Sequence, residues 1–418
     1  MNVLWIVNTL PPHIASCFGI ESKHAISWVD AMAKRLEISS DLSLGIATTG
    51  NDNELHHKLI GSINYYILPK SDVSSDCFDL VLNDFNPDVI HCYGTEERIS
   101  QNLIDKYKTD IPIIISLQGI ITEYVKHYYA GMSEKYIRRN YTIRDILLRD
   151  GIFSGRKKFE RQIPLEQRML NSVRYVEGRS DWDRVMSKDI NPNLKYYYCP
   201  RMIREEFYNH QWNYDSCEKY SILVHQGTYP IKGVHFMIDA LARLVKTYPN
   251  IKLYIAGNSN IIRDTWKKKL TTPGYAKIIA DKISKYNLKN NIIFTGYLNA
   301  EAMAEKLSCV NVCVIPSAIE NAPNALAEAM VVGTPCVASY VGGNPDMLNE
   351  GECGLLYRFD EPAMLADRIS VLFDHPDIAK QKSNHARRVA LGRHNPDKLV
   401  SMLKEIYKEV IIDFKRDN

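Results

Sequence analysis

Short apolar runs alternate along most of the chain with segments whose apolar residues recur at helical spacing. This alternation is typical of βα units and parallel sheets. In the first half it predicts strands at residues 3–7, 42–47, 64–68, 89–93, 113–117, 174–177 and 195–198. Helices are predicted between them, among others at residues 28–36, 101–107 and 180–188.

The periodicity fades over residues 208–220, which are polar and aromatic and are expected to link two domains. A second α/β series follows, with strands predicted at residues 222–225, 251–256, 291–295, 310–315, 336–339 and 355–357. The sequence thus predicts an α/β protein of two doubly wound, Rossmann-like domains. Ligands of such domains bind outside the carboxyl ends of the strands, so chemistry is expected in a cleft there.

Length and composition agree with two soluble globular domains. The chain has 418 residues, of which 45% are hydrophobic and 24% charged, and this excludes disordered, collagenous and coiled-coil classes. Its apolar runs are far shorter than the roughly 20 residues of a membrane span. The apolar N-terminus lacks the features of a signal peptide and is interpreted as a strand, so a cytoplasmic location is expected. Nine cysteines without a CxxC pair argue against a disulfide framework and a cysteine-based zinc site.

Positive charge is concentrated in one region. Residues 134–174 hold eleven Lys or Arg residues against five Asp or Glu residues, a net of +6, whereas the whole chain carries +3. Two interpretations remain open: a solvated helical face, or a surface that attracts phosphate or an anionic membrane. The basic residues that would contact an acceptor or lipid are Arg138, Arg139, Arg156, Lys157 and Lys158.

The most specific chemistry lies between residues 315 and 343. Residues 316–324 follow an apolar strand and precede a helical run at 325–330, with Pro323 suited to the first helical turn. Free backbone N–H groups near Asn324, Ala325 and Leu326, with the positive end of the helix dipole, suit a diphosphate. Glu320 and Glu328 flank this site, and a carboxylate can accept hydrogen bonds from two vicinal hydroxyls. Glu328 therefore suits a ribose and Glu320 a sugar, although a glutamate near a helix start can simply be a dipole partner.

The segment Glu320 to Glu328 resembles the Glu-x7-Glu motif of the retaining glycosyltransferases of family 4, which have the GT-B fold. The downstream segment 328–357 resembles the family pattern as well, and Gly227 to Gly233 resembles its phosphate loop. Elements at residues 88–94 and 178–184 resemble bacterial surface-polysaccharide members. The resemblance implies an N-terminal acceptor-binding domain at 1–207, a C-terminal donor-binding domain at 208–395, and a final helix within 396–418 that crosses back to the N-terminal domain.

Two catalytic residues are implied by this resemblance: Lys232 stabilises the diphosphate and Glu320 positions the donor. Donor contacts are expected from Glu328, Gly227, Thr228, Asn258, Gly296, Tyr297, Asn324, Ala325, Leu326, Gly19 and Gln118. Thr228 stands near the position where the family usually has an arginine, Gln118 where it often has a histidine, and Gly19 where it has two glycines.

Three further candidates have alternative explanations. Asp181 and Asp183 imitate a DxD metal motif, but their place at a helix start makes capping a sufficient explanation, and no metal is expected. His91 at a strand end and His13 in the first βα loop are candidate acceptor contacts, although such histidines are often structural or solvated. The chain has neither a GxGxxG fingerprint nor a P-loop, which argues against dehydrogenases and P-loop NTPases.

The expected function is metal-independent, retaining transfer of a sugar from a nucleotide diphosphate-sugar to a hydroxyl acceptor. The acceptor expected is a lipid diphosphate-linked saccharide of surface polysaccharide synthesis, used at the inner face of the plasma membrane by a peripherally bound enzyme. No nucleic-acid partner is expected. The alternatives are a GT-B nucleotide-sugar epimerase and a catalytically degenerate homologue that binds nucleotide sugar as a sensor or scaffold.

Overall fold

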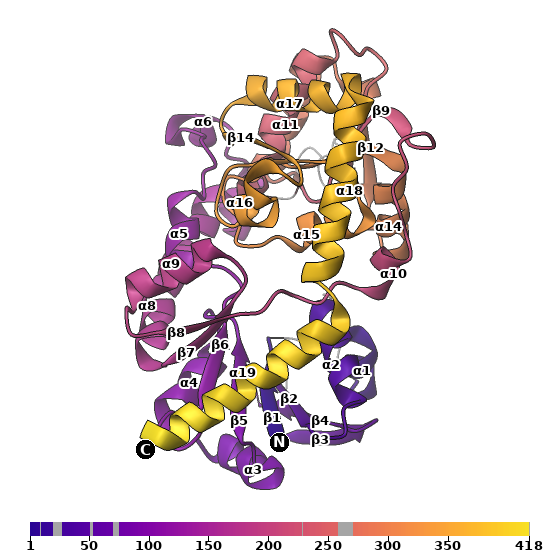
Figure 1. Cartoon of the computed structure of the whole chain (residues 1–418). Coiled ribbons are helices and arrows are strands. Elements are labelled where there is room, and N and C mark those ends of the chain that lie inside the picture. Colours follow the sequence, from indigo (N-terminus) through magenta and orange to yellow (C-terminus); the bar gives the residue numbers. More distant parts are fainter. Residues whose placement is uncertain are drawn as a thin grey trace. The chain divides into compact units, whose positions relative to one another are not determined.

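The computed structural model describes residues 1–8, 10–19, 27–50, 53–69, 75–227, 229–257 and 271–417. The chain divides into two compact units, each built on one sheet (Figure 1). The first unit comprises Met1–Ile120, Gln162–Arg204 and His394–Asn418. The second comprises Ile121–Arg161 and Glu205–Arg393.

The first unit contains an eight-stranded sheet of order β3-β4-β2-β1-β5-β6-β7-β8. Its strands are β1 (Asn2–Ile6), β2 (Ser43–Thr49), β3 (His56–Ile60), β4 (Ile63–Leu68), β5 (Val89–Tyr93), β6 (Ile113–Ser116), β7 (Tyr175–Gly178) and β8 (Lys195–Tyr198). Its helices are α1 (Pro12–Cys17), α2 (Ser27–Glu37), α3 (Ser75–Phe85), α4 (Arg98–Tyr107), α9 (Asp181–Ile190) and α19 (Pro396–Asp417). Helix α8 (Ile152–Ser172), which contains Pro164, crosses the boundary between the units.

Strand β3 was not expected from the sequence. It pairs antiparallel with β4, whereas the other neighbouring strands of this sheet are parallel. Its side chains are exposed or half-buried, as at the edge of a sheet, so it has no apolar run to mark it. The first sheet is therefore mixed, with one antiparallel edge strand.

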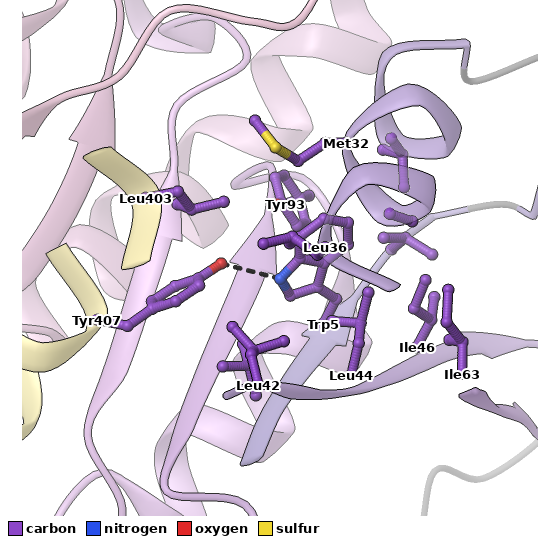
Figure 2. Packing of buried hydrophobic residues seen from close by; sticks show 14 of the residues in the cluster. Trp5, Met32, Leu36, Leu42, Leu44, Ile46, Ile63, Tyr93, Leu403 and Tyr407 are labelled. Carbon is purple, nitrogen blue, oxygen red and sulfur yellow. Dashed lines mark hydrogen bonds between the residues drawn. The ribbon is translucent and has the colours of Figure 1, made fainter. Parts of the chain in front are cut away.

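Residues on β1 alternate between the two faces of the first sheet, as strand geometry requires. Val3 and Trp5 pack with α2 and α19, while Leu4 and Ile6 pack in a second core on the opposite face. Trp5 is fully buried, and its indole Nε1 donates to the Tyr407 hydroxyl of α19 at 2.9 Å (Figure 2). The final helix thus belongs to the core of the first unit.

The second unit contains a six-stranded parallel sheet of order β11-β10-β9-β12-β13-β14. Its strands are β9 (Glu218–Val224), β10 (Lys252–Ala256), β11 (Ile292–Gly296), β12 (Val310–Ile315), β13 (Cys336–Ser339) and β14 (Leu355–Tyr357). Its α-helices besides the first part of α8 are α5 (Ile121–Lys126), α6 (Glu134–Arg139), α7 (Ile143–Leu148), α10 (Glu205–Tyr208), α11 (Val234–Leu244), α13 (Gly274–Lys285), α14 (Ala300–Cys309), α15 (Asn324–Val332), α16 (Asn344–Met347), α17 (Pro362–Asp374) and α18 (Pro376–Arg393). The 3₁₀ turns among its described residues are η1 (Pro230–Lys232), η2 (Lys289–Asn291) and η3 (Asn349–Gly351).

The units differ from the expected domain ranges mainly in the segment between β6 and β7. Residues 121–161, including α5, α6 and α7, group with the second sheet rather than with the first. Residues 208–220, interpreted as a linker, are packed within the second unit, where Trp212 is buried and its Nε1 donates to the Val310 carbonyl at 2.7 Å. Its aromatic residues thus serve packing, which composition alone did not reveal.

The nine cysteines are free; Cys17 and Cys309 are exposed, Cys77 is half-buried and the other six are buried. No helix in the described part of the chain is both long enough and apolar enough to cross a bilayer.

Candidate active site

The candidate site lies in the second unit, where strands β9 and β12 reach their carboxyl ends side by side. After β12, residues 316–323 lead into α15, which begins at Asn324 with Pro323 as its N-cap residue. The first intrahelical donors are the N–H groups of Leu326 and Ala327, which both bond to the Pro323 carbonyl. Helix geometry therefore leaves the N–H groups of Asn324 and Ala325 without an intrahelical acceptor. The structure thus leaves N–H groups at this end of α15 for an anion, and the expected binding of a diphosphate there stays a prediction.

Glu320 and Lys232 form an ion pair in this site. The Lys232 Nζ lies 2.6 Å from Glu320 Oε1, and the Ser317 hydroxyl donates to the same oxygen at 2.7 Å. Glu320 is 6% exposed, whereas the Lys232 side chain is 21% exposed. An ammonium has three donors, so Lys232 can retain Glu320 and still donate to a phosphate oxygen.

Burial and charge act in opposite directions on Lys232. Burial alone lowers the pKa of an ammonium, but the adjacent Glu320 carboxylate raises it and prevails, so the pKa of Lys232 lies above its ordinary value. Lys232 is therefore a permanent cation at physiological pH. It can bind and stabilise negative charge, but it cannot act as a general base.

The loop that carries Lys232 is fixed to the loop that carries Glu320. The Ala318 N–H donates to the Ile231 carbonyl at 2.7 Å. Gly233 has φ +69°, and a Cβ there would lie 1.7 Å from the Pro316 carbonyl oxygen. Only glycine permits this close approach, which brings Lys232 within reach of Glu320.

A second backbone contact supports Glu320 from the loop after β13. The Gly343 N–H donates to the Glu320 carbonyl at 3.2 Å. Gly342 has φ +51°, and a Cβ there would lie 1.6 Å from that carbonyl oxygen. The conformation of Glu320 is thus set by three loops, those after β9, β12 and β13.

Glu328 has a different partner from Glu320. It is 5% exposed within α15, and its Oε2 lies 3.0 Å from His225 Nε2. His225 directly follows β9, and Lys232 ends the loop that His225 begins. The two glutamates are thus held by residues at the two ends of the same loop. Glu320 contacts a permanent cation and Glu328 an imidazole, so the two carboxylates are chemically distinct.

Other expected donor contacts lie at the same edge of the sheet or outside the described residues. Gly227 is buried against Ile255 and Val234, and the Gly257 N–H donates to the Gly296 carbonyl at 2.9 Å. Tyr297 is 78% exposed. Thr228 and Asn258 lie outside the described residues.

Gly19 and Gln118 belong to the first unit. Gly19 follows α1 with φ +70°, and the Gln118 carbonyl accepts a hydrogen bond from Arg179 at 2.9 Å. Their expected contacts with a donor stay predictions.

His91 does not fit its expected role as an acceptor contact. Its side chain is wholly buried, its Nδ1 lies 2.7 Å from the Tyr407 hydroxyl, and its Nε2 lies 3.7 Å from Glu177. Burial lowers the pKa of His91. His91 is therefore a structural residue of the first unit.

His13 lies in α1 rather than in a loop, is half exposed, and has its Nε2 3.5 Å from Asp30.

Asp183 caps a helix, as its position suggested. It forms a capping box with Ser180 at the start of α9, and it accepts hydrogen bonds from the Arg179 N–H and the Tyr196 hydroxyl. Asp181 pairs with Arg184 at 2.5 Å. The capping explanation of this DxD segment is confirmed. Among the described residues, no three His, Cys, Asp or Glu side chains are grouped to hold a metal ion.

The expected acceptor-binding cations lie in the second unit and differ in their surroundings. Arg138 pairs with Glu134 and covers the Phe153 ring, and Arg156 pairs with Glu160 and covers the Tyr129 ring. The remaining expected cations are exposed: Arg139, Lys157 and Lys158.

Sequence reasoning missed three contributors to the site: His225, Ser317 and Gly342. His225 was placed at the end of an apolar strand and given no role, although the carboxyl end of a central strand is where ligands bind. Ser317 lies just before the Glu-x7-Glu segment, and Gly342 lies inside the downstream segment 328–357. Their spacing gave no sign that both would contact Glu320.

Residues 206–389 match the family model of the glycosyl transferases group 1. The chain is 25% identical over 203 residues to N-acetyl-alpha-D-glucosaminyl L-malate synthase of Bacillus anthracis, a match that covers 48% of this chain and 49% of that protein. It is 29% identical over 157 residues to glycogen synthase of Mycobacterium tuberculosis, covering 38% of this chain and 34% of that one. The chain thus spans half or less of the length of these curated relatives.

Solved structures resemble the chain over nearly its full length. Sucrose-phosphate synthase from Thermosynechococcus elongatus superposes with a TM-score of 0.72 at 17% identity, covering 99% of this chain and 100% of that chain. Anabaena HepE in complex with UDP and glucose superposes with a TM-score of 0.66 at 14% identity, covering 98% and 100%. The chain therefore has the GT-B fold, and residues 206–389 are similar to the glycosyl transferases group 1.

Proposed function

We propose that this protein is a retaining glycosyltransferase that moves a sugar from a nucleotide diphosphate-sugar to a hydroxyl group. The observation that carries the proposal is the ion pair between Lys232 and Glu320 beside the start of α15. A cation, open N–H groups and buried carboxylates meet there, and they match a diphosphate joined to two hydroxylated rings. The similar HepE structures hold UDP, glucose or UDP-glucose, so UDP-glucose is the first donor to test.

In the proposed reaction the glycosidic bond to the diphosphate breaks, and negative charge grows on the leaving oxygen. Lys232 and the N–H groups of Asn324 and Ala325 stabilise this charge, the electrostatic role that usually contributes most at such sites. The leaving diphosphate accepts the acceptor's hydroxyl proton on the same face as the new bond forms. Configuration is thereby retained without a separate general base.

The two glutamates are proposed to bind different parts of the donor. Glu328, which lies within α15 and is held by His225, binds the ribose hydroxyls. Glu320, in the loop before α15, binds the transferred sugar. Because Lys232 and α15 supply positive charge, the reaction is proposed to need no divalent metal ion.

The acceptor is proposed to be a saccharide on a lipid diphosphate, used in surface polysaccharide synthesis at a membrane. This proposal is supported by the exposed cations of residues 134–161. A lipid diphosphate presents phosphate together with an anionic surface, and both attract cations.

A panel of nucleotide sugars tests the donor first. A true donor present at 100 times its dissociation constant should stabilise the protein by about 2.7 kcal/mol, measured as a rise in Tm. With that donor, NMR of the product formed in EDTA should show the donor's anomeric configuration. A product of inverted configuration, or a strict need for Mn²⁺, would contradict the mechanism. Isomerisation of the donor sugar in the absence of an acceptor would indicate an epimerase. Donor binding without turnover would indicate a sensor or scaffold.

A further inference from the structure

Helix α7 exposes a group of large apolar side chains. Ile143, Ile146, Leu147 and Leu148 are 69%, 62%, 75% and 61% exposed. The first three stand at spacings i, i+3 and i+4, so they share one face of the helix. Single exposed apolar residues are ordinary, but four on one short helix indicate an interaction surface.

The buried side of α7 is polar. Asp145 is wholly buried, forms a capping box with Thr142, and accepts the Gly274 N–H of α13 at 3.2 and 3.0 Å with its two oxygens. Close by, Lys277 Nζ donates to Asn140 Oδ1 at 2.7 Å. Polar bonds thus fix α7 to the second unit, and they hold its apolar residues toward solvent instead of toward the core.

Unpaired positive charge lies on the segments before and after this apolar helix. Residues 134–161 contain nine Lys or Arg residues and four Asp or Glu residues. Glu134, Asp150 and Glu160 each pair with an arginine, and Asp145 is buried. The cations that remain exposed, with no ion-pair partner in the described part of the chain, are Lys135, Arg139, Arg149, Lys157, Lys158 and Arg161.

The helices that carry these cations pack around a shared aromatic residue. Phe153 of α8 is covered by Arg138 of α6, whose guanidinium lies 5.1 Å from the ring centroid. The same ring lies 5.7 Å from that of Tyr141, which stands just before α7. The end of α6, the residues just before α7 and the first turn of α8 therefore lie together, and Lys157, Lys158 and Arg161 follow in the next two to three turns of α8.

We propose that α7 and these cations dock the protein on an anionic lipid bilayer. Aliphatic side chains at the centre suit the acyl boundary, and a cationic rim suits anionic headgroups, the pattern of an interfacial helix. A protein groove could cover α7 but would leave the cations unmatched, and a nucleic acid would leave the aliphatic residues in water. With six residues, α7 can only lie in the interface. The inference extends the proposed lipid-linked acceptor, but it concerns lipid binding, which is measurable without sugar transfer.

Co-sedimentation of the full chain with vesicles tests the docking surface. Wild-type protein should bind vesicles of equal parts phosphatidylglycerol and phosphatidylcholine at low salt, and it should not bind phosphatidylcholine alone. Ile146→Ser/Leu147→Ser should lose at least about tenfold in lipid partitioning, because two exposed side chains no longer enter the bilayer. Arg139→Ser/Lys157→Ser/Lys158→Ser should lose more at low salt than at high salt, by about fivefold for each cation, which corresponds to about 1 kcal/mol.

Matched variants control for surface change elsewhere. Ile38→Ser/Leu59→Ser removes two side chains that are 81% and 64% exposed, and Lys246→Ser/Lys289→Ser/Lys398→Ser removes three exposed cations. Both should bind vesicles as the wild type does. In addition, Leu147→Trp should show a blue-shifted emission on anionic vesicles and Leu59→Trp should not, which keeps the test valid if the double variant misfolds.

Three results would overturn the docking proposal. They are absence of wild-type binding to anionic vesicles at low salt, unchanged binding by the α7 variant, and an α7 variant that changes only the oligomeric state. Donor-induced Tm shifts on the same preparations report the proposed function separately. A protein that binds donor but no vesicles would refute the docking surface alone.

Discussion

At the scale of single residues, Lys232 is the cation expected to bind the donor diphosphate. Its ammonium already holds Glu320 at 2.6 Å and has donors to spare. Lys232→Ala should weaken binding of the nucleoside diphosphate by about 1.5–3 kcal/mol, roughly 10- to 150-fold, as measured by calorimetry.

Lys282→Ala is the matched control for this experiment. Lys282 also forms an ion pair at 2.6 Å, with Asp239, and has a similar exposure of 18%, but it lies on α13. Its loss should change stability and leave nucleotide affinity unaltered. If the two variants bind nucleotide equally well, Lys232 does not contact the diphosphate.

Substitutions of the two glutamates should have different effects, one on nucleotide binding and the other on turnover. Glu328→Ala should weaken the affinity for the free nucleoside diphosphate, because the ribose loses its carboxylate. Glu320→Gln should keep that affinity while kcat falls, because its amide oxygen still accepts from Lys232 and Ser317 but binds the sugar less strongly. Calorimetry and steady-state kinetics measure the two effects, and equal losses of diphosphate affinity would show that this division is wrong.

The sequence pointed to Glu320 and Glu328 because their signal is local, whereas Lys232 was implied by the resemblance of residues 227–233. A strand, a polar loop and a helix in succession place Glu320 and Glu328 at a ligand-binding edge whatever the rest of the fold. His225 was missed because it closes an apolar strand and its partner Glu328 stands 103 residues away. His91 illustrates the reverse error: it also ends a strand, yet the long-range packing of Tyr407 buries it.

At the scale of elements, the loop after β13 should be essential for the site. An alanine at Gly342 would have to adopt φ +51° with its Cβ 1.6 Å from the Glu320 carbonyl oxygen. Gly342→Ala should therefore destabilise the protein by more than the roughly 1–2 kcal/mol that a left-handed residue costs. Denaturant unfolding measures the loss, and donor affinity should fall with it because Glu320 must move.

Gly392→Ala provides the comparison, because it lies in α18 with no atom within 4 Å of an added Cβ. That variant should be unchanged or about 0.5–1 kcal/mol more stable, since alanine favours a helix. Equal stability of the two variants would mean that the loop adapts freely and does not set the position of Glu320.

Elements with a strong apolar pattern were predicted well, and elements without one were not. Strands β5 and β12 are wholly buried and have the expected bounds. Edge strand β3 has no apolar run, so it was missed. In α7 the usual pattern is reversed: the charged Asp145 is buried and the apolar residues are exposed. Apolar periodicity predicts the wrong side of such a helix to face the core.

At the scale of the whole molecule, residues 121–161 were assigned to the wrong compact unit. Their order in the sequence favoured the first unit, because these residues lie between its strands β6 and β7. Hydrogen bonds between residues far apart in the sequence place them in the second unit instead. Asp145 bonds to Gly274, 129 residues away, and His235 bonds to Ala130, 105 residues away. Such contacts follow from tertiary packing and have no local signature.

Because of His235, the free energy of unfolding of the protein should depend on pH. Its Nε2 lies 3.0 Å from the Ala130 carbonyl, which can only accept, so the neutral ring donates from Nε2 and its Nδ1 accepts from the Tyr275 hydroxyl. Burial disfavours the imidazolium and lowers the pKa of His235 to about 4. In the unfolded chain the pKa is about 6.5.

The unfolded state therefore binds more protons than the folded state between these two values. The contribution of His235 is fully present above about pH 6.5 and is lost as the pH falls toward 4, up to about 3 kcal/mol in all. In His235→Gln the side-chain amide does not titrate, so the free energy of unfolding should decline less steeply over this range. His375→Gln, at an exposed ring, should follow the wild type. Denaturant unfolding at a series of pH values measures the slopes, and parallel curves for wild type and His235→Gln would show that the buried ring is protonated as readily in the folded chain as in the unfolded one.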